Sequence, residues 1–331
     1  MGLNQFIGNT PTLETIKRQL QQERLPHSML FVGMEGTGKR TLADFIAMAL
    51  NCLEGKLDFC GQCQSCRKIT ENCHPDVKHY EPEGQFIKIG QMRELSREVF
   101  FRPFEGKRRV FILDEADKMN LESANSILKT LEEPPDSSHL ILVSNQPNGL
   151  LTTVRSRCQI YRFGPLPPSD MEQVLIAKLS HSEEDLSLLS RISQGSIGRA
   201  LSLDLKEYKD ARQELFNLLE VCSQNFLYSR AAKSIAALAR EPEAFGNKVE
   251  ILYSLLHDLF LLKADASSEL ITHWDIRGKL LSLCCNFSFQ QIADGTKALD
   301  HIETGVRRNI SKPLALDHFV FRLSGQLTKQ D

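Results

Sequence analysis

A glycine-rich segment early in the chain has the residue types of a phosphate-binding loop. The segment 33–39 reads GMEGTGK, follows an apolar run and precedes an amphipathic stretch that extends to about Asn51. In the order strand, glycine loop, helix, backbone N–H groups converge on an anion at a helix N-terminus, and the lysine neutralises the β- and γ-phosphates. The pattern predicts a nucleotide site that includes these residues: Gly33, Gly36, Gly38 and Lys39.

The position after the lysine departs from the phosphate-loop pattern. That pattern has a Ser or Thr hydroxyl there to bind Mg²⁺, whereas this chain has Arg40, with Thr41 one residue later. A guanidinium is not a metal ligand, and a helix turns by about 100° per residue, so Thr41 should point elsewhere. Two interpretations stay open: a loop that binds nucleotide, with Thr41 among its contacts, and a loop that kept its shape and lost its nucleotide.

Two carboxylates directly follow the apolar run 110–113. Such a run predicts a buried parallel strand, and ligands of α/β proteins bind at the carboxyl ends of strands. Asp114 is therefore expected to accept hydrogen bonds from water on Mg²⁺, and Glu115 to polarise an attacking water if metal is bound. The string Asp-Glu-Ala-Asp suggests a helicase, but we exclude one because no paired second motor domain follows.

Three further segments carry polar residues that could meet a nucleotide. Ser144 and Asn145 end a predicted strand, where they could sense a γ-phosphate or simply cap the strand. Arg157, in the Ser-Arg-Cys segment 156–158, could act as an arginine finger on a neighbouring subunit or cap a helix C-terminus. Arg199 could lean over a nucleotide from a helical region.

Four of the nine cysteines form a dense cluster with the spacing C-x₇-C-x₂-C-x₂-C. They are Cys52, Cys60, Cys63 and Cys66. Four thiolates around one ion predict a structural, tetrahedral zinc site. A redox dithiol and a chance cluster are the alternatives, and Cys73 or His74 could replace one ligand with a poorer spacing.

Length and composition limit the classes of protein. A chain of 331 residues is long enough for two or three domains, and its net charge of −2, from 40 basic and 42 acidic residues, excludes a global basic field for nucleic acid. We find no secretory signal, no myristoylation pattern and no apolar run of roughly 18 residues. These features predict a cytoplasmic protein that does not enter a membrane.

A proline-rich segment, 165–170, marks the clearest domain boundary. Before it, predicted strands alternate with helices; after it, the chain reads as helical. Short helices follow the boundary, and the long amphipathic helices beyond them carry no catalytic constellation, which favours an assembly surface. Within the first part, the segment 121–133 predicts one helix with Leu121 inward, and the preceding helix is expected to bury Phe100.

Taken together, these motifs resemble the AAA+ clamp-loader family of bacterial DNA polymerase III. The resemblance rests on the cysteine module directly after the glycine loop, His-Pro-Asp at 74–76, Lys-Thr-Leu-Glu-Glu-Pro-Pro at 129–135 and Ser-Arg-Cys at 156–158, and it covers the whole chain. It implies an α/β P-loop AAA+ module with an inserted zinc knuckle, a helical lid and an all-α collar. The implied ranges are 1–166 with the zinc module at 52–66, 167–207, and 208–331.

The resemblance also implies a place in a ring of subunits. In that family, gamma/tau and delta subunits form a pentamer with a further subunit, and the ring opens a sliding clamp and places it on primed-template DNA. Arg40 favours a subunit with little or no ATPase of its own, for which Arg157 is the finger supplied to a neighbour's ATP. Lys39, Asp114 and Glu115 are retained, so a gamma/tau-like subunit that binds and hydrolyses ATP with Mg²⁺ is the alternative. A zinc-stabilised scaffold without nucleotide is a third.

Overall fold

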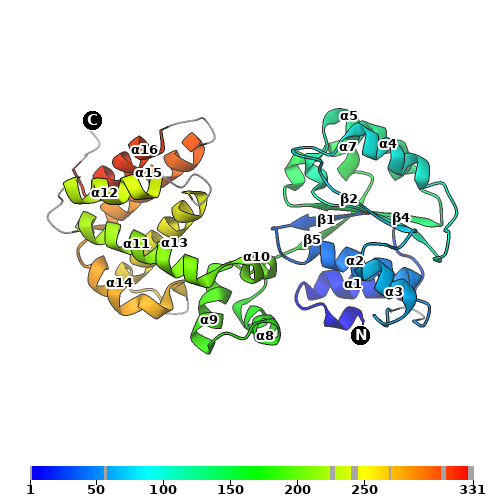
Figure 1. The fold of residues 1–331 in the computed structure, drawn as a ribbon, viewed down its shortest axis with the longest axis horizontal. Coiled ribbons are helices and arrows are strands. Elements are labelled where there is room, and N and C mark those ends of the chain that lie inside the picture. The colour runs from blue at the N-terminus through cyan, green and yellow to red at the C-terminus, as the bar shows by residue number, and fades with distance from the viewer. Residues whose placement is uncertain are drawn as a thin grey trace. The chain divides into compact units, whose positions relative to one another are not determined.

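The computed structural model describes residues 2–55, 58–223, 228–239, 245–267, 270–306 and 311–326 (Figure 1). The chain forms two compact units. The first comprises residues 1–179 and 193–201, and the second comprises residues 180–192 and 202–331. The glycine loop, both carboxylates, the cysteine cluster and the Ser-Arg-Cys segment all belong to the first unit.

A parallel sheet of five strands forms the centre of the first unit. The strands are β1 (Ser28–Gly33), β2 (Val77–Tyr80), β3 (Arg109–Leu113), β4 (Ser138–Ser144) and β5 (Gln159–Phe163). Their order in the sheet is β2-β3-β4-β1-β5, and every neighbouring pair is parallel. Because all strands point the same way, the segments that follow β1, β3 and β4 emerge at one edge of the sheet, where α/β proteins bind ligands.

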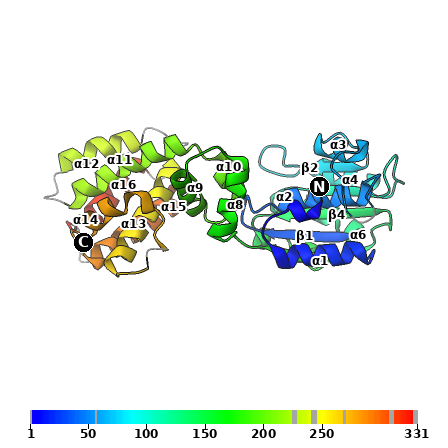
Figure 2. The same ribbon diagram turned by 90° about the horizontal axis from the view of Figure 1, so that it is seen from below.

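Helices cover both faces of this sheet (Figures 1 and 2). One face packs against α1 (Thr10–Gln21), α2 (Lys39–Asn51) and α3 (Gln64–Thr70), and the other against α4 (Ile89–Glu98), α5 (Leu121–Ser126), α6 (Leu128–Glu132) and α7 (Thr152–Arg155). Side chains alternate along each strand, so Phe31 joins the first core and Leu30 the second. The predicted α/β part with a parallel sheet is confirmed.

Two further helices complete the first unit, and the second unit is helical. α8 (Pro168–Lys178) and most of α10 (Ile197–Ser202) belong to the first unit. The second contains α9 (Glu183–Ile192), α11 (Leu205–Ser223), α12 (Tyr228–Ala239), α13 (Phe245–Lys263), α14 (Arg277–Cys284), α15 (Phe289–Val306) and α16 (Lys312–Leu323). Their core includes Leu255 and Phe319, both fully buried. Among the described residues, no helix has the length and apolar character of a membrane span.

Two expectations about buried side chains are wrong. The segment 121–133 is not one helix: α5 ends before Ile127, and α6 begins after it. Leu121, the first residue of the six-residue α5, is 64% exposed. Phe100 is 58% exposed because α4 ends at Glu98, so the helical spacing that predicted its burial no longer applies there.

A buried aspartate fixes the loop that leads into β3. Asp76 is 1% exposed, and its carboxylate accepts hydrogen bonds from the backbone N–H groups of Phe104 (2.7 Å), Glu105 (2.9 Å) and Gly106 (2.7 Å). Burial alone would raise the pKa of Asp76, but these donors outweigh it and hold the pKa below its usual value. The ionised carboxylate thus holds the start of the strand that carries Asp114.

We predict that Asp76→Asn destabilises the chain at pH 7 by about 1–3 kcal/mol, because the amide leaves backbone donors unsatisfied. The folded-state pKa lies below the unfolded-state value of about 3.8, so this stabilisation is complete above that value and is lost as the pH falls through the folded-state pKa. Urea unfolding of both proteins at pH 7 and pH 3 measures the difference, which should shrink in acid. Asp136→Asn, in an exposed loop, is the control; equal stability of Asp76→Asn and the wild type at pH 7 would contradict the role.

Candidate functional site

The glycine loop connects β1 to α2, as its sequence predicts. Gly33 is the last residue of β1, and Gly38 is the residue directly before α2. Gly38 has φ of 88°, in the left-handed region that favours glycine. The backbone therefore turns from the strand into the helix over the five residues 34–38, and Lys39 starts the helix.

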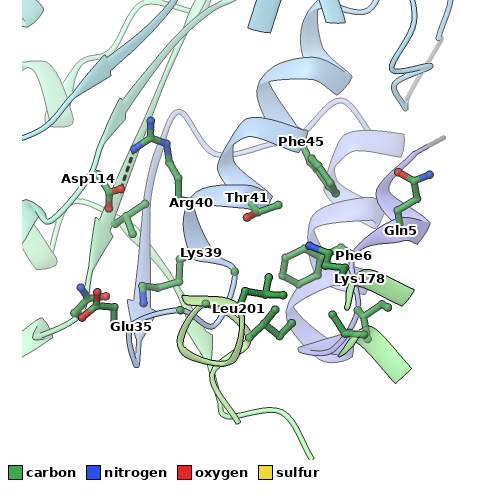
Figure 3. Close-up of a pocket in the computed structure, with 18 of the residues that line it drawn as sticks. Gln5, Phe6, Glu35, Lys39, Arg40, Thr41, Phe45, Asp114, Lys178 and Leu201 are labelled. Atoms are coloured by element: carbon green, nitrogen blue, oxygen red, sulfur yellow. Dashed lines mark hydrogen bonds and ion pairs between the residues drawn. The ribbon is translucent and has the colours of Figure 1, made fainter. Parts of the chain in front are cut away.

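A cavity of about 410 Å³ lies beside this loop at the carboxyl ends of the strands (Figure 3). It brings together most of the predicted nucleotide-site residues. These are Gly36, Gly38, Lys39, Thr41, Asp114, Glu115 and Asn145. Gly33, Ser144 and Arg199 are not in its lining.

Arg40 lies on the side of this cavity where the phosphate-loop pattern would place Mg²⁺. Its Nη1 donates to Asp114 Oδ2 at 2.8 Å and to Glu81 Oε1 at 2.9 Å, and its Nε lies 3.6 Å from Asp44 Oδ2. Figure 3 shows the Arg40 side chain reaching Asp114, whereas Thr41 and Phe45 lie on the other side of α2. Burial would lower the pKa of Arg40, but the hydrogen bond to Glu81 and the other two carboxylates raise it. The carboxylate expected to hold water on Mg²⁺ is thus bound to a permanent cation.

The ammonium group of Lys39 binds carbonyl groups of the glycine loop. Its Nζ donates to the carbonyl oxygens of Gly33 (2.8 Å) and Met34 (2.6 Å), and the residue is 4% exposed. Burial lowers the pKa of Lys39 to about 8, although the charge of Asp114 and two other carboxylates opposes the shift. A phosphate at this loop would have to replace the two carbonyls as the partner of the ammonium.

Glu115 lies at the tip of β3 with an unusual backbone. Its φ of 48° places it in the left-handed region, which is uncommon for a residue with a side chain and costs conformational energy. Its backbone N–H donates to Asp114 Oδ1 at 3.0 Å, and its carboxylate forms an ion pair with Lys118. Glu115 lines the cavity, but its carboxylate has a cationic partner in this conformation.

Ser144 and Asn145 are organised by Asp117. The Asp117 carboxylate accepts hydrogen bonds from Ser144 Oγ at 2.6 Å and from the backbone N–H of Asn145 at 3.1 Å. Ser144 is fully buried, and its Oγ also accepts from the N–H of Gln146 at 3.1 Å. These bonds favour a strand-end cap for Ser144, while Asn145 remains positioned in the cavity lining.

The start of α10 packs directly on the glycine loop. The N–H of Gly198 donates to Gly36 O at 2.9 Å, and a Cβ on Gly36 would lie 2.1 Å from Ser196 Oγ. Gly36 therefore permits a close approach of two segments, in addition to its φ of 72°. Ile197, Gly198 and Leu201 line the cavity, so this region reaches it through apolar atoms and backbone, and not through Arg199.

The four clustered cysteines have the geometry of a metal site. Their Sγ atoms all lie within 4.8 Å of one another, and those of Cys52 and Cys63 are 3.9 Å apart. In a tetrahedral site with Zn–S bonds of about 2.3 Å, sulfur atoms are about 3.8 Å apart. Burial would raise the pKa of Cys63, but backbone N–H donors, Cys66 N–H first among them, lower it to about 6. The donor set and the spacing fit a tetrahedral ion that prefers thiolates.

Arg157 lies just beyond α7, at the surface of the first unit. Its Nη1 donates to the carbonyl oxygen of Thr153 at 2.9 Å, so the side chain caps the end of α7. Its Nε donates to Glu132 Oε1 at 2.6 Å. Arg157 is not among the residues that line the cavity beside the glycine loop.

Sequence reasoning assigned no role to several residues that organise the site. Asp44 could have been found, because it lies four residues after Arg40 on a predicted helix, where opposite charges meet. Asp117 is visible in the Asp-Glu-Ala-Asp string, but its bond to Ser144 depends on the adjacency of β3 and β4. Glu81 also pairs with Arg40, and nothing in its local sequence links it to that residue.

Comparison with known proteins finds similarity to subunits of DNA polymerase III. Residues 8–167 match the protein-family model described as "DNA polymerase III, delta subunit". DNA polymerase III subunit delta' of Bacillus subtilis is 34% identical over 218 residues, which cover 64% of each chain. The same subunit of Pseudomonas aeruginosa is 37% identical over 175 residues, 51% of this chain and 53% of that one. Subunit gamma/tau of Mycoplasma pneumoniae is 36% identical over 203 residues, 60% of this chain and 30% of that one. This chain spans less than two thirds of each relative's length.

We predict that Arg40→Thr strengthens Mg²⁺-dependent nucleotide binding by at least about tenfold, or about 1.4 kcal/mol. The change restores the hydroxyl beside Lys39 and frees Asp114 from its guanidinium partner. Calorimetric titration of the isolated chain with ATP, with Mg²⁺ and with EDTA, measures the effect. Arg67→Thr, at an exposed residue of α3, is the control. Tight, Mg²⁺-dependent binding by the wild type that Arg40→Thr does not improve would contradict the account.

Proposed function

We propose that the chain acts as a delta-prime-like subunit of the DNA polymerase III clamp loader, and the family-model match over residues 8–167 and the delta' relatives support this proposal. In this proposal it assembles with gamma/tau and delta subunits into the ring that loads the sliding clamp on primed DNA. It contributes structure and an arginine finger to that ring, and little or no ATP hydrolysis of its own. In this proposal, clamp loading takes place in the cytoplasm.

The contact between Arg40 and Asp114 is the observation that carries this proposal. At 2.8 Å, the guanidinium takes a carboxylate oxygen that a hydrolysing site needs for water on Mg²⁺. Replacing a hydroxyl ligand by a cation also places like charges together, because Mg²⁺ would approach Arg40. Both effects weaken metal-dependent chemistry at this loop, while the fold around it persists.

The proposed assembly gives each part of the chain a role. Residues 1–166 would form the AAA+ module, 167–207 the lid and 208–331 the collar that joins the ring. Large exposed apolar side chains in the last range support an interface: Leu314 is 65% exposed, and Trp274 is 46% exposed. Clamp and primed DNA would be bound by the complex.

Arg157 is the proposed chemical contribution to the ring. A guanidinium outside the cavity of its own chain, just beyond a short helix at the surface, can face a nucleotide held by the next subunit. There it would stabilise the charge that develops on the transferred phosphoryl group. The hydrogen bond to Thr153 O holds the side chain near the end of α7, from which it would reach out.

Zinc is the proposed ion of the cysteine cluster. The set of four sulfur ligands leaves no open position for substrate, so the role is structural. Cys52 directly follows α2, and Cys63 caps α3. An ion held by these residues would join the helix that follows the glycine loop to the helix after it.

A gamma/tau-like ATPase is the second function to consider. Lys39, Asp114 and Glu115 all line the cavity, and the Mycoplasma pneumoniae relative is a gamma/tau subunit. This alternative requires Arg40 to leave Asp114 when nucleotide binds. Turnover by the isolated chain that Lys39→Ala abolishes would favour it.

We predict that Arg157→Ala lowers the ATPase rate of a ring reconstituted with gamma/tau and delta by roughly 10³-fold at the one site that it serves, with assembly unchanged. Single-turnover hydrolysis resolves that site from the others, and size-exclusion chromatography checks assembly. Arg155→Ala, two residues away at the end of α7, is the matched control. The proposed role fails if Arg157→Ala and Arg155→Ala rings hydrolyse ATP alike.

We also predict about one zinc ion per chain, measured by plasma emission spectrometry after dialysis. Cys63→Ser should lose the ion and lower the melting temperature, because ion binding stabilises the folded state. Cys73→Ser, at an exposed cysteine outside the cluster, should keep both. Metal-free protein with the same melting temperature as the zinc-loaded protein would exclude a structural ion.

A further inference from the structure

The side chain of Arg157 contacts an acidic residue of another helix. Glu132 is the last residue of α6, and its Oε1 accepts a hydrogen bond from Arg157 Nε at 2.6 Å and forms an ion pair with Nη2. One carboxylate oxygen therefore binds the edge of the guanidinium that is formed by Nε and Nη2. The two residues are 25 positions apart in the sequence, so the contact is made by the fold.

The remaining contacts of the guanidinium come from α7 and its C-cap, directly before Arg157. Nη1 donates to Thr153 O at 2.9 Å and lies 3.4 Å from Ser156 Oγ. A guanidinium has five N–H donors, and these contacts engage four of them. Among the described residues, one N–H on Nη2 is left to meet a ligand. Arg157 is thus held in one orientation while it keeps a donor for an acceptor from outside.

Glu132 is itself attached to the sheet. The preceding residue, Leu131, is 3% exposed, and its carbonyl oxygen accepts a hydrogen bond from Ser28 Oγ at 3.3 Å, at the start of β1. Pro134 and Pro135 follow after one further residue, Glu133, and proline cannot continue a helix. The position of Glu132 is fixed by the core and by the end of α6, so it can serve as a rigid support for a long side chain.

We propose that Glu132 is a positioning residue for Arg157, which fixes the guanidinium so that it meets the phosphate of a neighbouring subunit's nucleotide. This inference rests on the proposed function, in which Arg157 acts in trans. A long arginine side chain in solvent samples many conformations, and each contact with Glu132 removes some of them before the nucleotide arrives. Because the pair is partly exposed, its role is orientation and not stability of the fold.

The test compares three substitutions in the reconstituted ring by single-turnover hydrolysis. Glu132→Ala should lower the rate constant at the site that Arg157 serves by roughly 10- to 100-fold, with ATP affinity unchanged. Glu132→Gln keeps a carbonyl oxygen that can accept from Nε, so it should restore most of the rate. Glu133→Ala removes the adjacent exposed carboxylate and should match the wild type.

The double variant Glu132→Ala/Arg157→Ala separates positioning from a general loss of structure. If Glu132 acts through Arg157, the double variant should hydrolyse ATP at the rate of Arg157→Ala alone. Additive losses, a wild-type rate for Glu132→Ala, or an equal loss for Glu133→Ala would overturn the inference while leaving the role of Arg157 intact. A wild-type rate for Arg157→Ala would overturn both.

Discussion

The ion pair between Arg40 and Asp114 is the constraint on which the proposed function of the first unit depends. Arg40 follows the glycine loop, and Asp114 directly follows β3, so the contact joins the two segments that a hydrolysing site would use to hold Mg²⁺. Lys39 reinforces the same state, because its ammonium is bound to carbonyl groups of the loop. The cavity is still lined by these residues, but Arg40 is paired with Asp114 and Lys39 with loop carbonyls. Neither cation is therefore directed at a metal nucleotide.

The first unit has another arginine, Arg157, whose proposed role differs from that of Arg40. Arg157 lies beyond α7 and is held by Glu132 of α6, outside the cavity of its own chain. In the proposed role, Arg40 closes the metal position of this chain's own loop, and Arg157 serves the nucleotide of a neighbour. Under that proposal, a chain keeps most of a nucleotide-binding loop and still acts chiefly on another subunit's nucleotide.

Much of this arrangement could be predicted from local sequence. The glycine loop, the strand before Asp114 and the cysteine cluster each depend on residues within one short segment, and the structure places them as expected. Contacts between distant segments could not be predicted, because they depend on which strands are neighbours. The partners of Arg40 and Arg157 belong to this class. The break between α5 and α6 at Ile127 could not be predicted either, because no proline or glycine signals it.

The most direct test is a crystal structure of the chain grown with ATP and Mn²⁺, a Mg²⁺ substitute whose anomalous scattering locates it. The account predicts that Arg40 Nη1 stays within hydrogen-bonding distance of Asp114 and that no anomalous peak lies beside this carboxylate. An Mn²⁺ ion with Asp114 in its coordination shell, with Arg40 displaced and phosphates on Lys39, would contradict the account and indicate a subunit that hydrolyses ATP itself.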